Sequence, residues 1–589
     1  MSIAADGSGA ARDPPLRRHG WRAFLGGMIA LRRAVFLALM LLTTAGLVWL
    51  LWRVLAPGGW NGAKLLMLLC FAGIAPWLGV CVGNALPGFL LLVLARDPAR
   101  AVLPVTGDIA AAPVTTRTAL AVTVRNERME EVLPPLRRLL DGLDAAGAGA
   151  WFALFVLSDT QDPEAAAAEA AAVAAFGAGD PRRVAYRRRA DNAGFKAGNV
   201  MEFLDRHAEG FELAVMLDAD SEMSAAAVLR LVRIMQAAPR MGIVQHLTVG
   251  RPAEGAFPRL FQFGMRAGMR VWATGQAWWQ GDSGPYWGHN AILRIAPFRA
   301  HCRLAPLPDG QAILSHDQVE AARMRAAGWG VCVWAGEDGS QEGNPPALPE
   351  FLHRDARWLA GNLQYWHLLR LPGLWPMGLR PMGRWQLVQA MLMFAGAPLQ
   401  VAVLLLAAWL AATGSGQPPR GALLALALGW SLSLYCPKLL GYAEVLVSGA
   451  RAARYGGRVR FAAGAGLEIA FTLATDAVAQ VHKTLAMLRL ALGARPGWLP
   501  QNRQDRGVGW AEALRLFWPH TALGAVAFAL LARADGAAAW ALPFAGGLPL
   551  AVPLCVATAA PRVGRWLRRH GVAAVPEELS ALAAAVPPA

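Results

Sequence analysis

Charged residues are scarce in this sequence. Only 16% of the 589 residues are Asp, Glu, Lys or Arg, 55% are hydrophobic, and the mean hydropathy is +0.35. This composition is unlike that of soluble globular domains and predicts a membrane protein. The net charge of +16 does not indicate a nucleic-acid partner, because the basic residues form no stripe with interleaved aromatics. They flank the hydrophobic runs instead, as they do in the cytoplasmic loops of membrane proteins.

Several familiar signatures are missing. The six cysteines include no CxxC pair and no Cys/His spacing of a metal site, so we expect no structural disulfide and no zinc. No Walker-type phosphate loop is present, and we find no internal repeat of the kind that transporters usually contain. These absences disfavour a non-catalytic, nucleotide-binding transporter, although they leave it open as an alternative.

Long apolar runs divide the chain. Runs at 34–52 and 65–95 are each long enough to cross a bilayer, and later pairs lie at 387–412 with 422–447 and at 516–531 with 537–559. The first run begins only after residue 33 and is too long for a cleavable signal peptide. Residues 461–490 carry several charges, so we expect a helix in the inner interface, with a tight hairpin as the alternative. We therefore expect six spans and allow eight.

The expected organisation has eight parts. They are a basic cytoplasmic tail (1–33), two transmembrane helices (34–95), a cytoplasmic domain (96–370), an interfacial segment (371–386), a transmembrane hairpin (387–447), cytoplasmic or interfacial helices (448–510), a second hairpin (511–560) and a cytoplasmic tail (561–589).

The segment from 100 to about 370 has short apolar strands that alternate with helix-like sequence. The strands are expected at 118–124, 151–159, 211–218 and 242–249. This alternation predicts a largely parallel α/β sheet with both faces covered. Ligands in such sheets bind beyond the carboxyl ends of the strands, where Asp159, Asp218 and Asp220 fall.

The pair Asp218 and Asp220 is the first candidate site. Two carboxylates this close repel each other unless something positive lies between them. Mg²⁺ or Mn²⁺ binds few protein carboxylates and completes its coordination with phosphate oxygens and water, which suits a nucleoside diphosphate. An Asp-x-Asp pair is common, however, and by itself it does not establish a site.

Other polar residues favour the same chemistry, each with a plain structural alternative. Lys196 lies between glycines and suits a diphosphate, or is an ordinary loop lysine. Asp159 suits the base or ribose of a nucleotide, or caps a helix. Asp317 opens an amphipathic helix, where a carboxylate also complements the helix dipole. Arg354 and the neighbouring Arg357–Trp358 pair suit diphosphate and sugar, or form an interfacial belt.

The ordered set Asp159, Asp218-x-Asp220, Asp317 and Arg354-x-x-Arg357-Trp358 resembles the membrane-embedded family 2 glycosyltransferases, with cellulose and hyaluronan synthases as relatives. "VTVRNERMEEV" is similar to their opening strand, and "KAGNV" looks like their lysine-glycine-asparagine motif. Two departures stand out: "SHD" replaces Thr-Glu-Asp, and Arg354 replaces glutamine. With "GDSGPYWGHNAILR", these departures make the chain look like the osmoregulated periplasmic glucan glucosyltransferases.

The resemblance implies a GT-A-type α/β domain inserted between transmembrane helices of the bacterial inner membrane, with the catalytic domain cytoplasmic. It implies UDP-glucose as donor, a growing β-glucan (β-1,2 in this group) as acceptor, Mg²⁺ or Mn²⁺ as cofactor, and inner-membrane lipid around the spans. It assigns Asp317 as general base and Asp218 and Asp220 to the metal. The nucleotide sugar is assigned Thr123, Glu127, Asp159, Lys196, Asp218, Arg354 and Arg357, and the acceptor Gly288, His289, Asn290, Asp317 and Trp358.

The resemblance further implies acyl carrier protein and a periplasmic glucan-processing protein as partners. Two other activities stay open: a cellulose-type synthase, and a transferase that moves one sugar to a lipid carrier.

Overall fold

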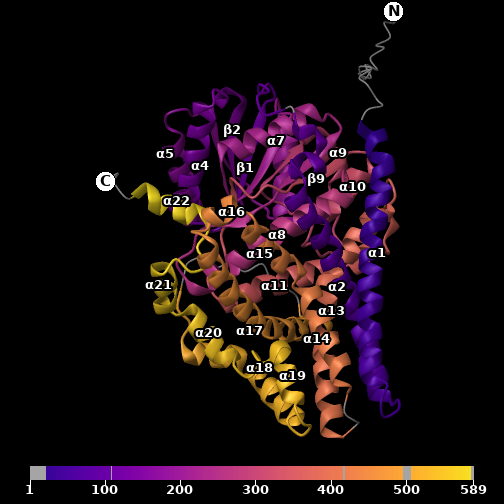
Figure 1. Cartoon of the computed structure of the whole chain (residues 1–589). Coiled ribbons are helices and arrows are strands. Elements are labelled where there is room, and N and C mark those ends of the chain that lie inside the picture. The colour runs from indigo at the N-terminus through magenta and orange to yellow at the C-terminus, as the bar shows by residue number, and fades with distance from the viewer. Residues whose placement is uncertain (1–20, 108, 415–417, 495–505, 586–589) are drawn as a thin grey trace, which may run out of the picture.

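The computed structural model describes residues 21–107, 109–414, 418–494 and 506–585. It places an α/β domain at one end of a set of long helices (Figure 1). The first 20 residues of the predicted basic tail and the last four of the predicted C-terminal tail lie outside the described residues.

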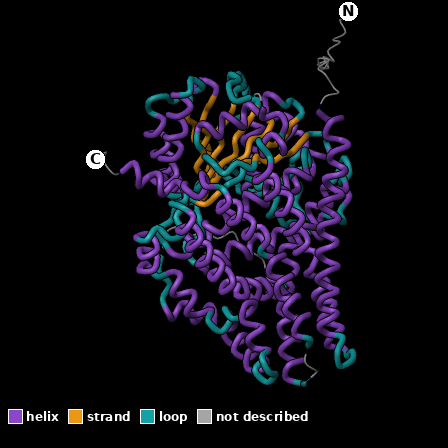
Figure 2. The backbone as a smooth tube through the Cα atoms, viewed as in Figure 1, coloured by secondary structure: helices purple, strands orange, loops and turns teal. Residues whose placement is uncertain are grey.

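The main sheet has seven strands in the order β3–β2–β1–β4–β8–β6–β9. Figure 2 shows the strands in orange among the helices of this domain. They are β1 (Thr118–Val124), β2 (Phe152–Ser158), β3 (Val184–Arg188), β4 (Leu213–Asp218), β6 (Met241–His246), β8 (Ala291–Arg294) and β9 (Gly330–Trp334). All neighbouring pairs are parallel except those of β8, which runs antiparallel to β4 and β6. The prediction of a largely parallel sheet is confirmed.

The two faces of the sheet bury different side chains. Leu120 and Val122 of β1 pack with α4 (Met129–Ala145) and α7 (Ala225–Ala237), whereas Ala119 and Ala121 pack with α6 (Phe195–Arg206). This separation follows from the alternation of side chains along a strand. The small residues face α6, whose first turn carries Lys196.

A second, three-stranded sheet lies beyond the end of β4. It consists of β5 (Glu222–Met223), β10 (Ser340–Glu342) and β7 (Val249–Gly250), with β10 in the middle. Strand β10 pairs antiparallel with β5 and parallel with β7. Because β5 follows Asp218 and Asp220 directly, β10 is held beside the predicted metal site.

Five helices of the described chain are long and apolar enough to cross a membrane. They are α1 (Trp21–Leu55) from Met28 onward, α2 (Gly62–Leu94), α13 (Pro381–Ala412), α17 (Arg458–Ala491) and α18 (Trp510–Leu531). A sixth span is obtained if α14 (Arg420–Leu434) and α15 (Cys436–Val447), which are bent by 71°, count as one. These helices suit membrane association, as the composition predicts.

The structure differs from the expected membrane segments in three places. Helix α1 begins at Trp21, so part of the predicted tail is helical, and Arg33 donates to Ser283 Oγ at 3.0 Å. The run at 537–559 forms two nine-residue helices, α19 (Ala537–Ala545) and α20 (Ala551–Ala559). Between them Gly547 packs against the Ala474 carbonyl of α17 with no room for a side chain.

The third difference is α17 itself, which is one continuous helix of 34 residues. The hairpin alternative for 461–490 is therefore wrong. The most apolar window of α17 has a hydropathy of 1.3, which is enough for a crossing. Its predicted interfacial position stays a prediction.

Candidate active site

The carboxyl ends of β1, β2 and β4 bring the predicted polar residues to one edge. Thr123 pairs in register with Asp218, and Val124 pairs with Ser158, the residue before Asp159. Thr123 Oγ1 donates to Asp218 Oδ1 at 3.3 Å. Glu127 lies in the loop that follows β1 and is partly buried. The strand register therefore places these side chains along one edge, as the sequence predicts.

Asp159 has a partner that sequence reasoning missed. Arg189, just beyond β3, donates from Nε to Asp159 Oδ1 at 2.5 Å and from Nη2 to Oδ2 at 2.8 Å. Asn199 adds a bond of 2.9 Å to Oδ1. Both members of the ion pair are buried. Such two-pronged pairs fix geometry as well as charge, and the run of three arginines at the end of β3 was the available signal.

Arg189 also shapes the loop that leads to Lys196. It donates to the carbonyls of Ala193 at 2.8 Å and Phe195 at 2.6 Å. Gly194 and Phe195 both have positive φ, at 70° and 50°, so the chain turns sharply here. The buried pair therefore positions Lys196, whose Nζ forms an ion pair with Asp218 Oδ1. In this structure Lys196 supplies positive charge beside the paired carboxylates.

The donor set of this edge suits a hard divalent cation. Asp218 and Asp220 offer carboxylate oxygens, which Mg²⁺ and Mn²⁺ prefer. Among the described residues no group of three or more His, Cys, Asp or Glu side chains is arranged to hold a metal. Two carboxylates still fit a cation that takes its remaining ligands from phosphate and water.

Asp317 lies across a narrow gap from Lys196. It is the first residue of α10 (Asp317–Ala326). Gly288, at φ +84°, lies between them: a Cβ placed there would be 3.5 Å from Asp317 Cβ and 3.8 Å from both Asp317 Oδ2 and Lys196 Nζ. Burial raises the pKa of the Asp317 carboxyl, the charge of Glu320 raises it further, and His316 and Lys196 oppose the rise. A partly buried acid with a raised pKa is a stronger base than an ordinary aspartate and so is better suited to accept a proton.

The loop before Asp317 is held by residues that the sequence did not single out for this role. Tyr365 is fully buried and donates from its hydroxyl to the Ser315 carbonyl at 2.8 Å. Gln364 donates to the Ala312 carbonyl at 3.1 Å and accepts from the Leu314 amide at 2.9 Å. The segment after Trp358 therefore fixes the position of Asp317.

The arginine motif lies on α11 (Leu348–Leu363). The Arg354 guanidinium stacks 4.6 Å from the Trp358 ring, and Arg357 is partly buried one turn further along. Burial lowers the pKa of Arg354, whereas the charges of Glu342, Asp355 and Asp220 raise it. Arg354 thus lies in the field of Asp220. Trp358 is 47% exposed, so its ring is open to a ligand.

The three predicted acceptor residues are adjacent in sequence but face different ways. Gly288 adjoins Asp317, and His289 Nε2 lies 3.4 Å from Glu342 Oε2. Asn290 is fully buried at φ +49° and donates from Nδ2 to Ser340 Oγ at 2.9 Å. Its side chain holds the loop against β10 rather than pointing toward Asp317.

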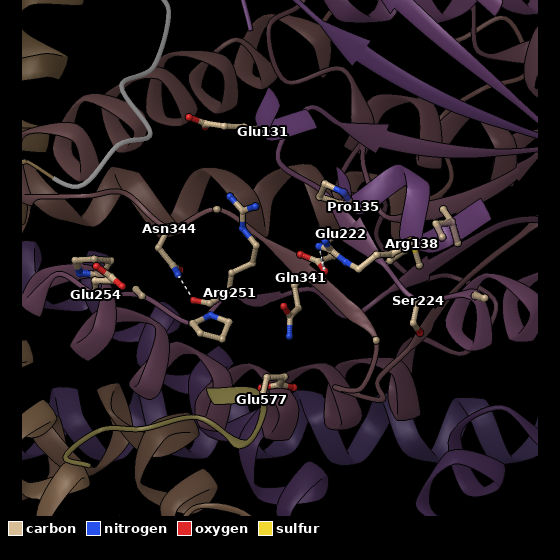
Figure 3. A pocket seen from close by; sticks show the side chains of 18 residues that line it. Glu131, Pro135, Arg138, Glu222, Ser224, Arg251, Glu254, Gln341, Asn344 and Glu577 are labelled. Carbon is tan, nitrogen blue, oxygen red and sulfur yellow. Dashed lines mark hydrogen bonds and ion pairs between the residues drawn. The ribbon is translucent and has the colours of Figure 1, made fainter. Parts of the chain in front are cut away.

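A large cavity of about 1,040 Å³ lies on the other side of β10. Gln341, Arg251 and Asn344 line it, together with Glu577 from the C-terminal helix α22 (Pro576–Ala585) (Figure 3). Gly343, the residue after β10, also lines this cavity, and a Cβ there would lie 3.0 Å from Asp220 Oδ2. The cavity thus lies next to Asp220 at the predicted metal site, and Asp317 is not among the residues that line it.

Comparison with known proteins shows similarity to glycosyltransferases. The family model for glycosyl transferase family group 2 matches residues 213–440. Glucans biosynthesis glucosyltransferase H of Pseudomonas putida is 32% identical over 616 residues, covering 96% of this chain and 70% of that protein. The protein of the same name from Xanthomonas campestris pv. campestris is 32% identical over 582 residues, covering 94% and 88%.

Among solved structures, the mannosyltransferase PcManGT from Pyrobaculum calidifontis in complex with GDP-Man and Mn2+ covers 73% of this chain and 100% of its own. It is 16% identical to this chain, with a TM-score of 0.44.

Proposed function

The chain belongs to the glucans biosynthesis glucosyltransferase H family, within the group 2 glycosyl transferases, and from that premise we propose that it transfers glucose from UDP-glucose to a growing β-glucan. The product would be the backbone of osmoregulated periplasmic glucans. One observation carries the proposal: Asp317 and Lys196, the latter paired with Asp218, face the same gap at Gly288. A base and a leaving-group site on opposite sides of one gap suit a direct displacement.

The leaving-group side is formed by Asp218, Asp220 and Lys196. Mg²⁺ or Mn²⁺ bound by the two aspartates would neutralise charge on the departing diphosphate. Lys196 is placed to contact a phosphate oxygen, and the loop that carries it is fixed by Arg189. The Asp159 carboxylate accepts hydrogen bonds from Arg189, and the two residues together would form the buried wall against which the uridine binds. Thr123 and Glu127 would complete the nucleotide site.

The acceptor side is formed by Asp317. Its carboxylate would take the proton from the attacking hydroxyl as that oxygen bonds to the anomeric carbon. The bond from this carbon to the diphosphate breaks in the same step, and its electron pair leaves with UDP. One displacement inverts the centre, so an α-linked donor gives a β-linked product. The raised pKa of Asp317 supports this role, because a stronger base accepts the proton more readily.

The helix α11 would close the donor site. Arg354 lies in the field of Asp220, and an arginine fork pairs well with a diphosphate. Arg357 would assist it, and the exposed Trp358 ring would stack on an acceptor sugar. Gly288 and His289 would line the same path, and Asn290 would hold that loop in place.

We also propose that the protein is a multi-pass inner-membrane protein, with the α/β domain in the cytoplasm, that passes its glucan across the membrane. Buried polar groups among the long helices support a polar interior. Glu468 of α17 is fully buried, pairs with Lys438 of α15, and accepts from Thr472 at 2.6 Å. Charged groups buried among membrane-spanning helices are costly and are retained where they have a function.

The test is to identify the product. Purified protein in lipid nanodiscs is given radiolabelled UDP-glucose with Mg²⁺, and the product is digested with linkage-specific glucanases. A product cut by a β-1,2-glucanase supports the proposal. A β-1,4 polymer would instead indicate a cellulose-type synthase, and label confined to the lipid fraction a lipid-carrier transferase. Nucleotide binding without transfer would contradict an enzymatic function.

A further inference from the structure

Glu342 is a carboxylate at the site to which the reaction above assigns no role. It is the last residue of β10, the central strand of the small sheet. Its neighbours Gln341 and Gly343 line the large cavity, and Gln341 is labelled in Figure 3. Successive side chains of a strand point to opposite faces. Glu342 therefore points away from the cavity, toward the 288–290 loop, where His289 Nε2 lies 3.4 Å from its Oε2.

Strand β10 lies between the two halves of the reaction, since a Cβ at Gly343, the residue after it, would be 3.0 Å from Asp220 Oδ2, and the 288–290 loop contacts its other side. Burial raises the pKa of its carboxyl, and Asp220 and Asp218 raise it further, whereas His289 and Arg354 lower it. Independently, the Asn290 side chain donates to the Gln341 carbonyl at 3.3 Å, which ties the 288–290 loop to β10. Strand β10 thus lies next to the metal-site carboxylates on one side and the acceptor loop on the other, and the Glu342 carboxylate contacts the loop while it feels the charge of Asp218 and Asp220.

The carboxylate has hydrogen-bonding capacity left for a ligand. An ionised carboxylate offers about four lone-pair sites. Within the described part of the chain, its only recorded contact is with His289, and that contact is longer than an ordinary hydrogen bond. Asp159, by contrast, accepts three hydrogen bonds from Arg189 and Asn199. The Glu342 side chain is still 21% exposed, so a ligand can reach it.

The chemistry of the site limits what that ligand can be. A diphosphate would be repelled by a third carboxylate beside Asp218 and Asp220. Between a leaving diphosphate and an acceptor lies the sugar that is transferred, and its hydroxyls are neutral hydrogen-bond donors. We propose that Glu342 accepts hydrogen bonds from hydroxyls of the donor sugar and thereby selects that sugar. This inference rests on the proposed transferase function.

The test separates the sugar from the nucleotide. Affinities for UDP and for a non-transferable phosphonate analogue of UDP-glucose are measured calorimetrically, in the presence of Mg²⁺, on the full-length protein. In Glu342→Gln we expect the analogue to bind about 10- to 100-fold more weakly, the loss of one hydrogen bond to a charged group, while UDP binds within about twofold of wild type. Gln341→Ala, on the same strand but facing the cavity, is the matched control and should change neither affinity.

Two results would overturn the inference. If Glu342→Gln weakens the affinities for UDP and for the analogue equally, Glu342 acts on the nucleotide diphosphate rather than on the sugar. If both affinities are unchanged, Glu342 does not contact the sugar. Thermal unfolding of each variant checks that it is folded, and Glu342→Asp serves as a second variant if Glu342→Gln is not. If the wild-type protein transfers a sugar other than glucose, the proposed donor is wrong, and the same comparison with the analogue of that donor still tests Glu342.

Discussion

Replacing Gly288 by alanine tests whether the substrates meet between Asp317 and Lys196. The new methyl group would lie 3.5 Å from Asp317 Cβ and 3.8 Å from Lys196 Nζ, which are ordinary contact distances. The free protein can therefore accommodate it without displacing either residue. Substrate atoms in the same gap cannot, because the methyl occupies part of their space.

The magnitude has two parts that can be separated. An L-residue at the positive φ of Gly288 costs about 1–2 kcal/mol in stability. Displacing the reacting atoms by about 1 Å costs about 100-fold in rate, or about 2.7 kcal/mol of barrier. Gly310 provides the control, since its φ is +78° and a Cβ there would have no neighbour within 4 Å. Gly310→Ala carries the backbone strain without the crowding.

The assay combines thermal unfolding with the transfer rate at saturating UDP-glucose. Both variants should lose similar stability, and only Gly288→Ala should lose about 100-fold in transfer. If Gly288→Ala transfers at the rate of Gly310→Ala, the substrates do not meet in this gap and the assignment of the site is refuted.

Three further predictions follow from buried charges. Arg189→Gln leaves the buried Asp159 carboxylate without its opposite charge, so stability should fall by about 3–5 kcal/mol in thermal unfolding. UDP should also bind more weakly in calorimetry, and unchanged UDP affinity would contradict the role of this pair. Burial alone would raise the pKa of the Glu337 carboxyl, but Arg266, Arg451 and Arg270 hold it at about 2. Wild-type stability should therefore fall as the pH is lowered from about 4.5 to 2. In thermal unfolding, Glu337→Gln should be less stable than wild type near pH 7 and should lack this contribution to the pH dependence. The raised pKa of Asp317 predicts that kcat declines with falling pH at a higher pH than for an ordinary aspartate, near 3.9, and a profile with the ordinary value would argue against burial of the base.

Local patterns were sufficient to predict which carboxylates meet at this edge of the sheet. Continuously apolar strands followed by Asp159, Asp218 and Asp220 place carboxylates at one edge of a parallel sheet, because strand direction determines which ends coincide. Asp317 could be predicted at a helix start, because an amphipathic helix pattern begins there. Four of the seven strands (β1, β2, β4 and β6) and the position of these residues at strand ends therefore follow from sequence alone, whereas β3, β8 and β9 were not predicted.

The supporting residues could not be predicted, because they depend on contacts between distant segments. Glu342 lies on a three-residue strand that has no pattern of its own and is recognisable only through its pairing with β5 and β7. Arg189 is one of three consecutive arginines, and only the fold shows which one meets Asp159. Hydropathy likewise could not show that the run at 537–559 is broken where Gly547 packs against α17.

The central claim is that Asp317 is the base of a glucosyl transfer, and Asp317→Asn tests it most directly. In nanodiscs with UDP-glucose and Mg²⁺, this variant should bind UDP like the wild type and transfer glucose about 10²–10⁴-fold more slowly. Asp309→Asn, in the exposed loop before α10, is the matched control and should keep full activity. Transfer by Asp317→Asn at the wild-type rate, with UDP binding intact, would contradict the account.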